Sequence, residues 1–263
     1  MKTSAMIFAA GLGTRLYPLT ATRPKALVEY QGKTLLEHAI LKVMEAGITH
    51  IVVNVHHFGE QIIDFINQHY FNATIEVSDE REKLLDTAGG LKFAEHFFPH
   101  CNQILLYNVD VISSIDLKKF IINDGMMRRL DDEMIRLNDE KLNLCSSVAS
   151  ASSACPITTI AKLAVRTRQT SRYFLFEESN LRLCGWENRE TKEQKICYEV
   201  EKTTPLAFSG IHLVDKKILD YIPKNEKISF TPLYLELAKD HFIQGYLHDE
   251  DEWQDLGKLT IDN

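Results

Sequence analysis

The sequence predicts an α/β fold, a three-layer α/β/α sandwich around a mostly parallel mixed sheet. Two observations carry this prediction: strand and helix patterns alternate through the first half of the chain, and several expected strands are short apolar runs. Strands that alternate with helices at this spacing form parallel sheets whose two faces are covered. A chain of 263 residues, with 44% hydrophobic and 25% charged residues, is long enough to bury such a core.

The first half of the chain carries clear signals for its elements. Residues 48–55 (ITHIVVNV) are rich in β-branched side chains and follow Gly47, which favours a strand. Thr34 and Glu37 form a capping-box pattern, so a helix is expected to begin there and to end before Gly47. The same reasoning predicts strands at 5–10, 48–55, 73–77 and 103–107 and helices at 34–46, 59–69 and 90–98.

The second half is less regular. A charged stretch at 124–143 is typical of an exposed helix, and the small polar residues of 143–156 indicate a loop. Strands are predicted at 157–166, 172–177, 181–185, 195–200 and 206–214, and helices at 216–222 and 231–241.

Composition narrows the classes of protein to which this chain can belong. With 30 Lys and Arg against 37 Asp and Glu, the net charge is -7, so we expect no nucleic acid among its partners. The five cysteines form no C-x-x-C pair, which predicts neither a disulfide framework nor zinc and favours a cytoplasmic protein. No stretch approaches the roughly 20 apolar residues of a membrane span, so no membrane contact is expected.

A glycine-rich loop follows the first expected strand, where parallel sheets bind ligands. Gly11 and Gly13 allow backbone amides to approach phosphate oxygens, and Arg15 can hold a phosphate through two hydrogen bonds. A tight turn between strand and helix explains the Gly-x-Gly pair equally well. The dinucleotide fingerprint is excluded because Leu16 replaces its third glycine, and a Walker A motif is excluded because Leu27 stands where its first glycine belongs.

The run GLGTRLYPLTATRPKALV extends this loop and resembles the signature of sugar-nucleotide pyrophosphorylases, G-x-G-T-R-x-x-P-L-T followed by P-K-P. Ala26 and Glu29 depart from that pattern where proline is common. The resemblance implies a Rossmann-like fold of the nucleotide-diphospho-sugar transferase type. It also implies that Arg15 and Lys25 are catalytic groups that hold phosphates, and that Ala9, Ala10, Gly11, Gly13 and Thr14 bind the nucleotide.

Two aspartates are candidates for holding Mg²⁺ as a cofactor. Asp110 follows an apolar run that is expected to be a strand, and a carboxylate at this edge of the sheet suits a hard cation. Capping of the next turn is the alternative role for Asp110. Residues 253–257 (WQDLG) resemble the family's W-x-D-x-G element, which implies that Asp255 is the second metal ligand.

Three further segments resemble pieces of the family. Residues 86–90 (DTAGG) resemble a segment near the base, which implies nucleotide contacts from Thr87 and Gly89. Residues 208–212 (FSGIH) resemble a strand beside the sugar, which implies sugar contacts from Ser209 and Gly210. Lys202 lies in a V-E-K element that lacks the family's following proline. We therefore expect one nucleotidyltransferase domain over 1–263, with a nucleotide-binding part at 1–123 and a sugar-binding part, including the second metal aspartate, at 124–263.

The resemblance implies a sugar-1-phosphate nucleotidyltransferase, whose partners are a nucleoside triphosphate and a sugar 1-phosphate. Segments 86–90, 208–211 and 253–257 look most like enzymes that use UTP and N-acetylmuramate 1-phosphate, which supply precursors of the cell wall. A mannose-1-phosphate guanylyltransferase is the near alternative. A metal-dependent glycosyltransferase and a silent sugar-nucleotide-binding protein are alternatives from other classes. The sequence leaves the base, the sugar and the oligomeric state open.

Overall fold

The computed structural model of the chain describes residues 2–122 and 159–258. The helix expected at 124–143 and the loop expected at 143–156 lie outside the described residues. In the described part of the chain, no helix is both long enough and apolar enough to cross a membrane.

The described strands form one large sheet and two short pairs. The strands of the sheet are β1 (Thr3–Phe8), β4 (His50–Val55), β5 (Thr74–Asp79), β6 (Gln103–Asn108), β8 (Thr159–Arg166), β9 (Arg172–Glu177), β10 (Leu183–Asn188), β11 (Glu193–Ile196), β12 (Thr203–Asp215) and β13 (Phe242–Leu247). The short pairs are β2 (Glu29–Tyr30) with β3 (Lys33–Thr34), and β7 (Val111–Ser113) with β14 (Trp253–Asp255). The described helices are α1 (Leu35–Glu45), α2 (Gly59–Gln68), α3 (Asp86–Phe93), α4 (Leu117–Ile122) and α6 (Phe230–Leu237).

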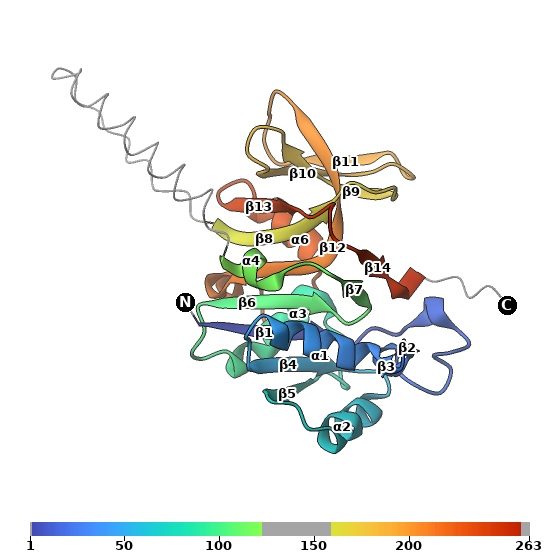
Figure 1. Cartoon of the computed structure of the whole chain (residues 1–263). Coiled ribbons are helices and arrows are strands. Elements are labelled where there is room, and N and C mark those ends of the chain that lie inside the picture. Colours follow the sequence, from blue (N-terminus) through green and yellow to red (C-terminus); the bar gives the residue numbers. More distant parts are fainter. Residues whose placement is uncertain (1, 123–158, 259–263) are drawn as a thin grey trace.

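The large sheet is mixed. Its strand order is β11-β10-β9-β12-β6-β1-β4-β5, with β8 paired to β12 and β13 paired to β8. Figure 1 shows the sheet running from β5 near the bottom of the view to β11 at the top. The strands β6, β1, β4 and β5 are parallel, whereas β12 pairs antiparallel with β6, β8 and β9. The parallel half places the carboxyl ends of its strands at one edge, where ligands bind in such sheets.

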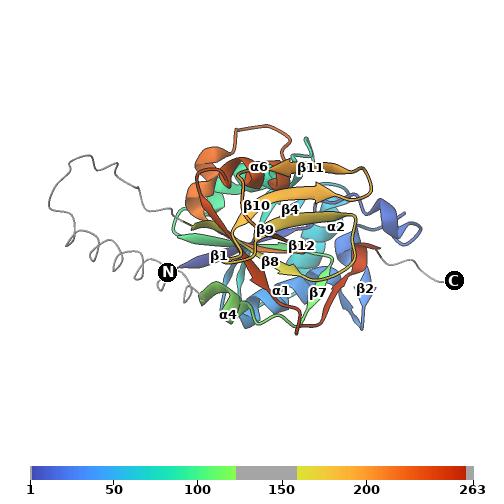
Figure 2. The same ribbon diagram turned by 90° about the horizontal axis from the view of Figure 1, so that it is seen from above.

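Helices cover both faces of the parallel half. Alternate residues of β1 point to two different cores: Met6 packs with buried residues of α3 and α6, whereas Ala5 and Ile7 pack with those of α1. This alternation is expected for a strand that is buried on both sides. Figure 2, seen from above, shows α1 and α6 on opposite sides of the strands. The layers are therefore helix, sheet and helix.

The long strand β12 joins the two halves of the sheet. Its last residues pair with β6, and its first residues pair with β9. Its pairing with β8 shifts register between Phe208 and His212, around Gly210, which has a φ of 78°. Glycine adopts this left-handed conformation at little cost, so the strand can change direction there.

Several boundaries differ from the sequence prediction. The strand expected at 195–200 is β11, which lies earlier and pairs only with the exposed edge of β10. The helix expected at 90–98 begins four residues earlier, at Asp86, whose side chain accepts the amide of Thr87 at 2.7 Å. It ends at Phe93 and gives way to a 3₁₀ turn. The helix expected at 216–222 is also a 3₁₀ turn, and β2, β3, β7, β13, β14 and α4 were not predicted.

Candidate active site

The glycine loop after β1 opens the candidate site at the carboxyl edge of the parallel strands. The backbone amides of Ala9 and Ala10 donate to the side-chain oxygen of Asn54 at 2.8 and 3.2 Å. Gly13 has a φ of 66°, and a Cβ there would lie 3.1 Å from the Cβ of Lys25. A side chain at residue 13 would therefore push the glycine loop away from the backbone that carries Lys25. Asn54, which lies in β4, holds the first turn of the loop in place.

Lys25 lies against Asp110, although 85 residues separate them in the sequence. Its Nζ is 2.6 Å from Oδ2 of Asp110, and the two side chains are only 14% and 10% exposed. A Cβ on Gly11 would lie 3.9 Å from the same ammonium group, so the cation is within reach of the glycine loop. Pro24 has an extended conformation and leads into the short 3₁₀ turn that begins at Lys25. The structure thus brings together the predicted phosphate-binding lysine and the first predicted metal ligand.

Asp255 reaches the site through β14, which pairs with β7 so that Asp255 lies opposite Val111. The amide of Leu256 donates to the backbone carbonyl of Asp110 at 2.9 Å and ties the two segments together. Gly257 lies between the two carboxylates: a Cβ on it would be 2.3 Å from Oδ2 of Asp110 and 3.0 Å from Oδ1 of Asp255. Two carboxylates that converge on one point can share a divalent cation.

The donor set of this carboxylate pair fits Mg²⁺. Magnesium takes oxygen ligands, and in phosphate-transfer sites it is commonly held by one or two carboxylates together with substrate phosphates. In residues 2–122 and 159–258, no group of three or more His, Cys, Asp and Glu side chains gathers at a metal position. Asp110 and Asp255 are two carboxylates of the site that could hold such an ion together with substrate phosphates.

Arg15 lines a cavity of about 380 Å³ that the sequence did not predict. The walls of this cavity also include Arg168, Arg172, Trp186 and Phe208. Aromatic rings pack against the C–H faces of ligands, and guanidinium groups hold phosphates and carboxylates through paired hydrogen bonds. The cavity is therefore suited to an anionic sugar. It opens beside the loop that carries Arg15 and Thr14, both of which are exposed.

Arg168 is a candidate that sequence reasoning missed. Its guanidinium group lies over the ring of Trp253, 4.6 Å from the ring centroid, and donates to the carbonyl of Phe208 at 3.2 Å. Burial lowers the pKa of Arg168, and the nearby charge of Asp255 opposes that shift. Its Nε is buried without a hydrogen-bond partner in the described part of the chain. A single arginine after a strand gives no signal in the sequence, because its setting depends on a tryptophan far along the chain.

The predicted base-binding segment forms the start of α3, and the loop before α6 covers it. The amide of Gly89 donates to the carbonyl of Ile228 at 3.0 Å, and Oγ1 of Thr87 accepts the amide of Phe230 at 3.2 Å. A Cβ on Gly89 would lie 2.3 Å from the carbonyl oxygen of Glu226, so only glycine fits there. The Gly89 amide already has a partner within the protein. Contacts from Thr87 and Gly89 to a base stay a prediction.

The predicted sugar-binding residues of β12, Ser209 and Gly210, contact residues that lie close to the two aspartates in the chain. Ser209 is buried, with its hydroxyl 2.7 Å from Nε2 of His248, and its carbonyl accepts the indole N–H of Trp253 at 2.9 Å. A Cβ on Gly210 would lie 2.9 Å from Nδ2 of Asn108. These contacts tie β12 to the segments that carry both aspartates. Direct contact of Ser209 and Gly210 with a sugar stays a prediction.

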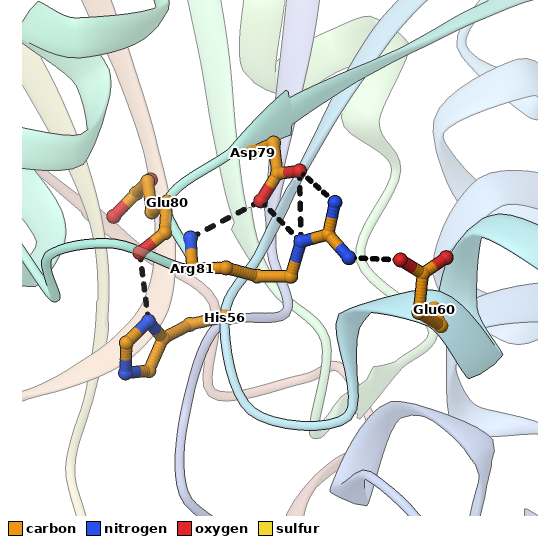
Figure 3. Close-up of polar contacts among 5 residues, drawn as sticks. All are labelled: His56, Glu60, Asp79, Glu80 and Arg81. Carbon is orange, nitrogen blue, oxygen red and sulfur yellow. Dashed lines mark hydrogen bonds and ion pairs between the residues drawn. The ribbon is translucent and has the colours of Figure 1, made fainter.

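A second hollow, of about 890 Å³, lies beside the loop that follows β5. Figure 3 shows the guanidinium group of Arg81 in this loop between the carboxylates of Asp79 and Glu60. The ring of His56 lies under the backbone of Glu80, with Nδ1 2.7 Å from the carbonyl oxygen. Exposed ion pairs of this kind contribute little stability, so this network chiefly orients the loop.

The side chain of Glu80 points inward, in contrast to its neighbours. It is 2% exposed, and its Oε1 accepts the amide of Asn54 at 2.8 Å. A Cβ on Gly90 would lie 2.7 Å from the same oxygen. Burial raises the pKa of Glu80, and the hydrogen bond from Asn54 opposes the rise. A polar relay therefore runs from Glu80 through Asn54 to the amide of Ala9.

Comparisons with known proteins identify relatives of this chain. The profile of the nucleotidyl transferase family matches residues 4–125. An N-acetylmuramate alpha-1-phosphate uridylyltransferase from Caulobacter vibrioides is 28% identical over 256 residues, which cover 96% of this chain and 91% of that protein. A mannose-1-phosphate guanyltransferase from Hypocrea jecorina is 39% identical over 119 residues, which cover 44% of this chain and 32% of that protein.

Solved structures share the fold along nearly the whole chain. A putative glucose-1-phosphate thymidylyltransferase from Bacillus anthracis, in complex with a sucrose, superimposes with a TM-score of 0.68 at 19% identity and covers 97% of this chain and 90% of its own. A UDP-glucose pyrophosphorylase complexed with UDP-glucose gives a TM-score of 0.66 at 17% identity, covering 98% and 94%. At these identities the likeness concerns the fold, and it confirms the predicted three-layer architecture with a mixed sheet.

Proposed function

We propose that this chain, which belongs to the nucleotidyl transferase family, transfers the uridylyl group of UTP to N-acetylmuramate 1-phosphate and releases pyrophosphate. Transfer of a nucleotidyl group to a sugar 1-phosphate is the activity that its relatives share. The observation that carries the proposal is the convergence of Lys25, Asp110 and Asp255 beside the glycine loop. The choice of sugar rests on the uridylyltransferase that aligns with 96% of this chain.

The proposed reaction is a direct displacement at phosphorus. An oxygen of the sugar 1-phosphate attacks the α-phosphorus of UTP and forms the new P–O bond. The bond from the α-phosphorus to the bridging oxygen breaks, and pyrophosphate leaves with the electron pair. The protein has little covalent work to do, because positioning and neutralisation of charge supply most of the catalysis.

Lys25 and Arg15 would bind the phosphates of the nucleotide. The ammonium group of Lys25 is largely buried, so its charge acts on the reacting phosphate with little screening by water. Asp110 and Asp255 would hold Mg²⁺, which, when bound, neutralises phosphate charge and orients the substrates. The relay from Glu80 through Asn54 keeps the glycine loop in one position.

The sugar 1-phosphate would enter through the cavity that Arg15 and Arg168 line. Burial lowers the pKa of Arg168 and the charge of Asp255 acts to raise it, so the two side chains lie close together. An anion bound by Arg168 would therefore lie near the Mg²⁺ that Asp110 and Asp255 are proposed to hold. The ring of Trp186 offers a surface for the sugar. In this arrangement the two substrates meet between the glycine loop and Asp255.

A release assay for pyrophosphate tests the proposal. UTP, GTP, CTP and dTTP would each be paired with N-acetylmuramate, N-acetylglucosamine, mannose and glucose 1-phosphates, and kcat/KM measured for each pair. We expect the highest value for UTP with N-acetylmuramate 1-phosphate. If no pair releases pyrophosphate in the presence of Mg²⁺, the reaction is wrong.

GTP with mannose 1-phosphate is the second candidate pair. It is supported by the 39% identity to a mannose-1-phosphate guanyltransferase over 44% of this chain, which an N-acetylmuramate alpha-1-phosphate uridylyltransferase from Neisseria meningitidis nearly equals with 38% identity over 43% of this chain. A preference for this pair in the same assay would change the substrates and leave the reaction type intact. A site that hydrogen-bonds one base discriminates strongly, because the wrong base leaves buried polar groups unpaired.

A further inference from the structure

We propose that the cavity beside Arg168 selects hexose 1-phosphates that carry a second anionic group besides the phosphate, and that Arg172 binds this second group. The proposal rests on the proposed function, because it names the class of sugar that the same site accepts. N-acetylmuramate 1-phosphate belongs to this class through its lactyl carboxylate, and a hexuronate 1-phosphate belongs to it through C6.

The first argument is the charge of the cavity wall. The described residues that line the cavity include three arginines, Arg15, Arg168 and Arg172, and no Asp or Glu. The whole chain, in contrast, carries a net charge of -7, so this concentration of positive charge is local. A wall of this kind raises the affinity for anions through the summed field of its cations.

The three arginines lie at different places in the site, so each is expected to bind a different anionic group of the substrates. Arg15 follows the glycine loop, where the proposed reaction places the nucleotide phosphates. Arg168 lies over Trp253 and senses Asp255, which places it near the reacting phosphate of the sugar. Arg172 is exposed and begins β9, which pairs with β10 and β12, whereas Asp255 lies in β14, which pairs with β7. A neutral sugar 1-phosphate would leave this third cation without a group to bind.

Arg172 itself lines the cavity, on the face of β9 that also carries Phe174. Side chains alternate along a strand, so Arg172 and Phe174 lie on one face. Phe174 is opposite Trp186 in the register with β10, and both of these aromatic residues line the cavity. A sugar ring that packs on Trp186 would therefore have the guanidinium group of Arg172 at its edge.

The nearest acidic side chain on β10 does not neutralise Arg172. Glu187 lies opposite Tyr173, on the other face of the strand pair, and its Oε1 is 2.6 Å from Nε of Arg189. In the part of the chain that the structure describes, no carboxylate lies within ion-pair distance of Arg172. Its charge is therefore available for a substrate carboxylate.

The test compares pairs of sugars in which one member carries a carboxylate-bearing group that the other lacks. N-acetylmuramate 1-phosphate is paired with N-acetylglucosamine 1-phosphate, and glucuronate 1-phosphate with glucose 1-phosphate, each with the best nucleotide and Mg²⁺. A charged hydrogen bond at a partly exposed site is expected to favour the acidic member by roughly tenfold or more in kcat/KM. Arg172→Gln should remove this preference and leave kcat/KM for the neutral member within about threefold. Arg172→Lys, which keeps the charge, should restore part of it.

Lys119→Gln is the control, because it removes one exposed positive charge on α4, outside the cavity lining, where Nζ of Lys119 lies 3.4 Å from Oδ2 of Asp116. It should leave the preference unchanged. The proposal is overturned if wild-type protein prefers the neutral sugars, or if Arg172→Gln lowers both members equally while circular dichroism shows a folded protein. In either case pyrophosphate release persists and nucleotidyl transfer to a sugar 1-phosphate stands, but a preference for the neutral sugars would also replace N-acetylmuramate 1-phosphate as the proposed substrate. If no sugar phosphate supports release, the proposed function fails and this inference fails with it.

Discussion

Replacing Gly257 with alanine tests the convergence of the two aspartates without changing any charge. The added Cβ would lie 2.3 Å from Oδ2 of Asp110 and 3.0 Å from Oδ1 of Asp255. Ordinary van der Waals contact begins at 3.4 Å, so the carboxylate of Asp110 would have to move by about 1 Å. The ion pair between Lys25 and Asp110 would be distorted at the same time, because Nζ of Lys25 contacts the oxygen that is displaced.

A displacement of this size has a calculable effect on turnover. Misplacing a catalytic group by about 1 Å can lower the rate by roughly 100-fold. We therefore expect kcat/KM of Gly257→Ala to fall by about two orders of magnitude, which corresponds to about 2.7 kcal/mol of transition-state stabilisation. The concentration of Mg²⁺ at half-maximal activity should rise as well. Pyrophosphate release, measured across a magnesium titration, gives both quantities.

Gly47→Ala separates this effect from a general loss of stability. Gly47 ends α1 with a φ of 83°, and its Cβ position has no heavy atom within 4 Å. Alanine there should cost about 1–2 kcal/mol of unfolding free energy through backbone strain and leave kcat/KM unchanged. A folded Gly257→Ala variant with kcat/KM within threefold of wild type and an unaltered magnesium titration would refute the geometry argued for the two aspartates.

Three further predictions follow from the same structure. Lys25→Ala should lower kcat by about two orders of magnitude or more with the circular dichroism spectrum unchanged, because it removes the buried charge beside the reacting phosphate; near-native turnover would contradict that role. Asp110→Asn and Asp255→Asn should each abolish turnover or weaken its dependence on divalent cations, since a carboxamide lacks the charge that balances Mg²⁺; full wild-type activity in excess chelator would show that the metal assignment is wrong. Burial lowers the pKa of His212 from 6.5 to about 3, so below pH 6.5 the unfolded chain binds a proton that the folded protein excludes. The stability that the neutral His212 contributes is therefore fully present above pH 6.5, and the unfolding free energy falls by up to about 1.4 kcal/mol per pH unit from there toward pH 3. Denaturant titrations at pH 7 and pH 5 should show that the unfolding free energy of His212→Gln falls less between these two pH values than that of the wild type, and equal falls would contradict the assignment.

The parallel half of the fold could be predicted because its signals are local. Residues 48–55 combine β-branching with a preceding glycine, and the structure places β4 within them. Oγ1 of Thr34 accepts the amide of Glu37 at 3.1 Å, as the capping pattern indicates. The strands β7 and β14 could not be predicted in the same way. Each has three residues and is defined by its partner, which lies far away in the sequence.

The candidate site was partly predictable for the same reason. The motif that contains Lys25 and the element that contains Asp255 are continuous in sequence, and the structure brings both to Asp110. Arg168 escaped prediction because its surroundings come from a distant strand. The relay through Asn54 did leave a signal, since a polar residue within the apolar run IVVNV requires buried hydrogen-bond partners.

The strand β12 links the two differently built halves of the sheet, which in the proposed reaction bind the two substrates. One end of this strand pairs with β6, which leads into Asp110, and the other pairs with β9, which begins at Arg172. Between these ends, the carbonyl of Ser209 accepts the indole N–H of Trp253, two residues before Asp255. A shift of the sugar cavity relative to the glycine loop would have to break main-chain pairing on both sides of Gly210. The separation between the two proposed substrate positions is therefore set by a continuous backbone, which leaves the proposed selection of the sugar to a side chain, Arg172.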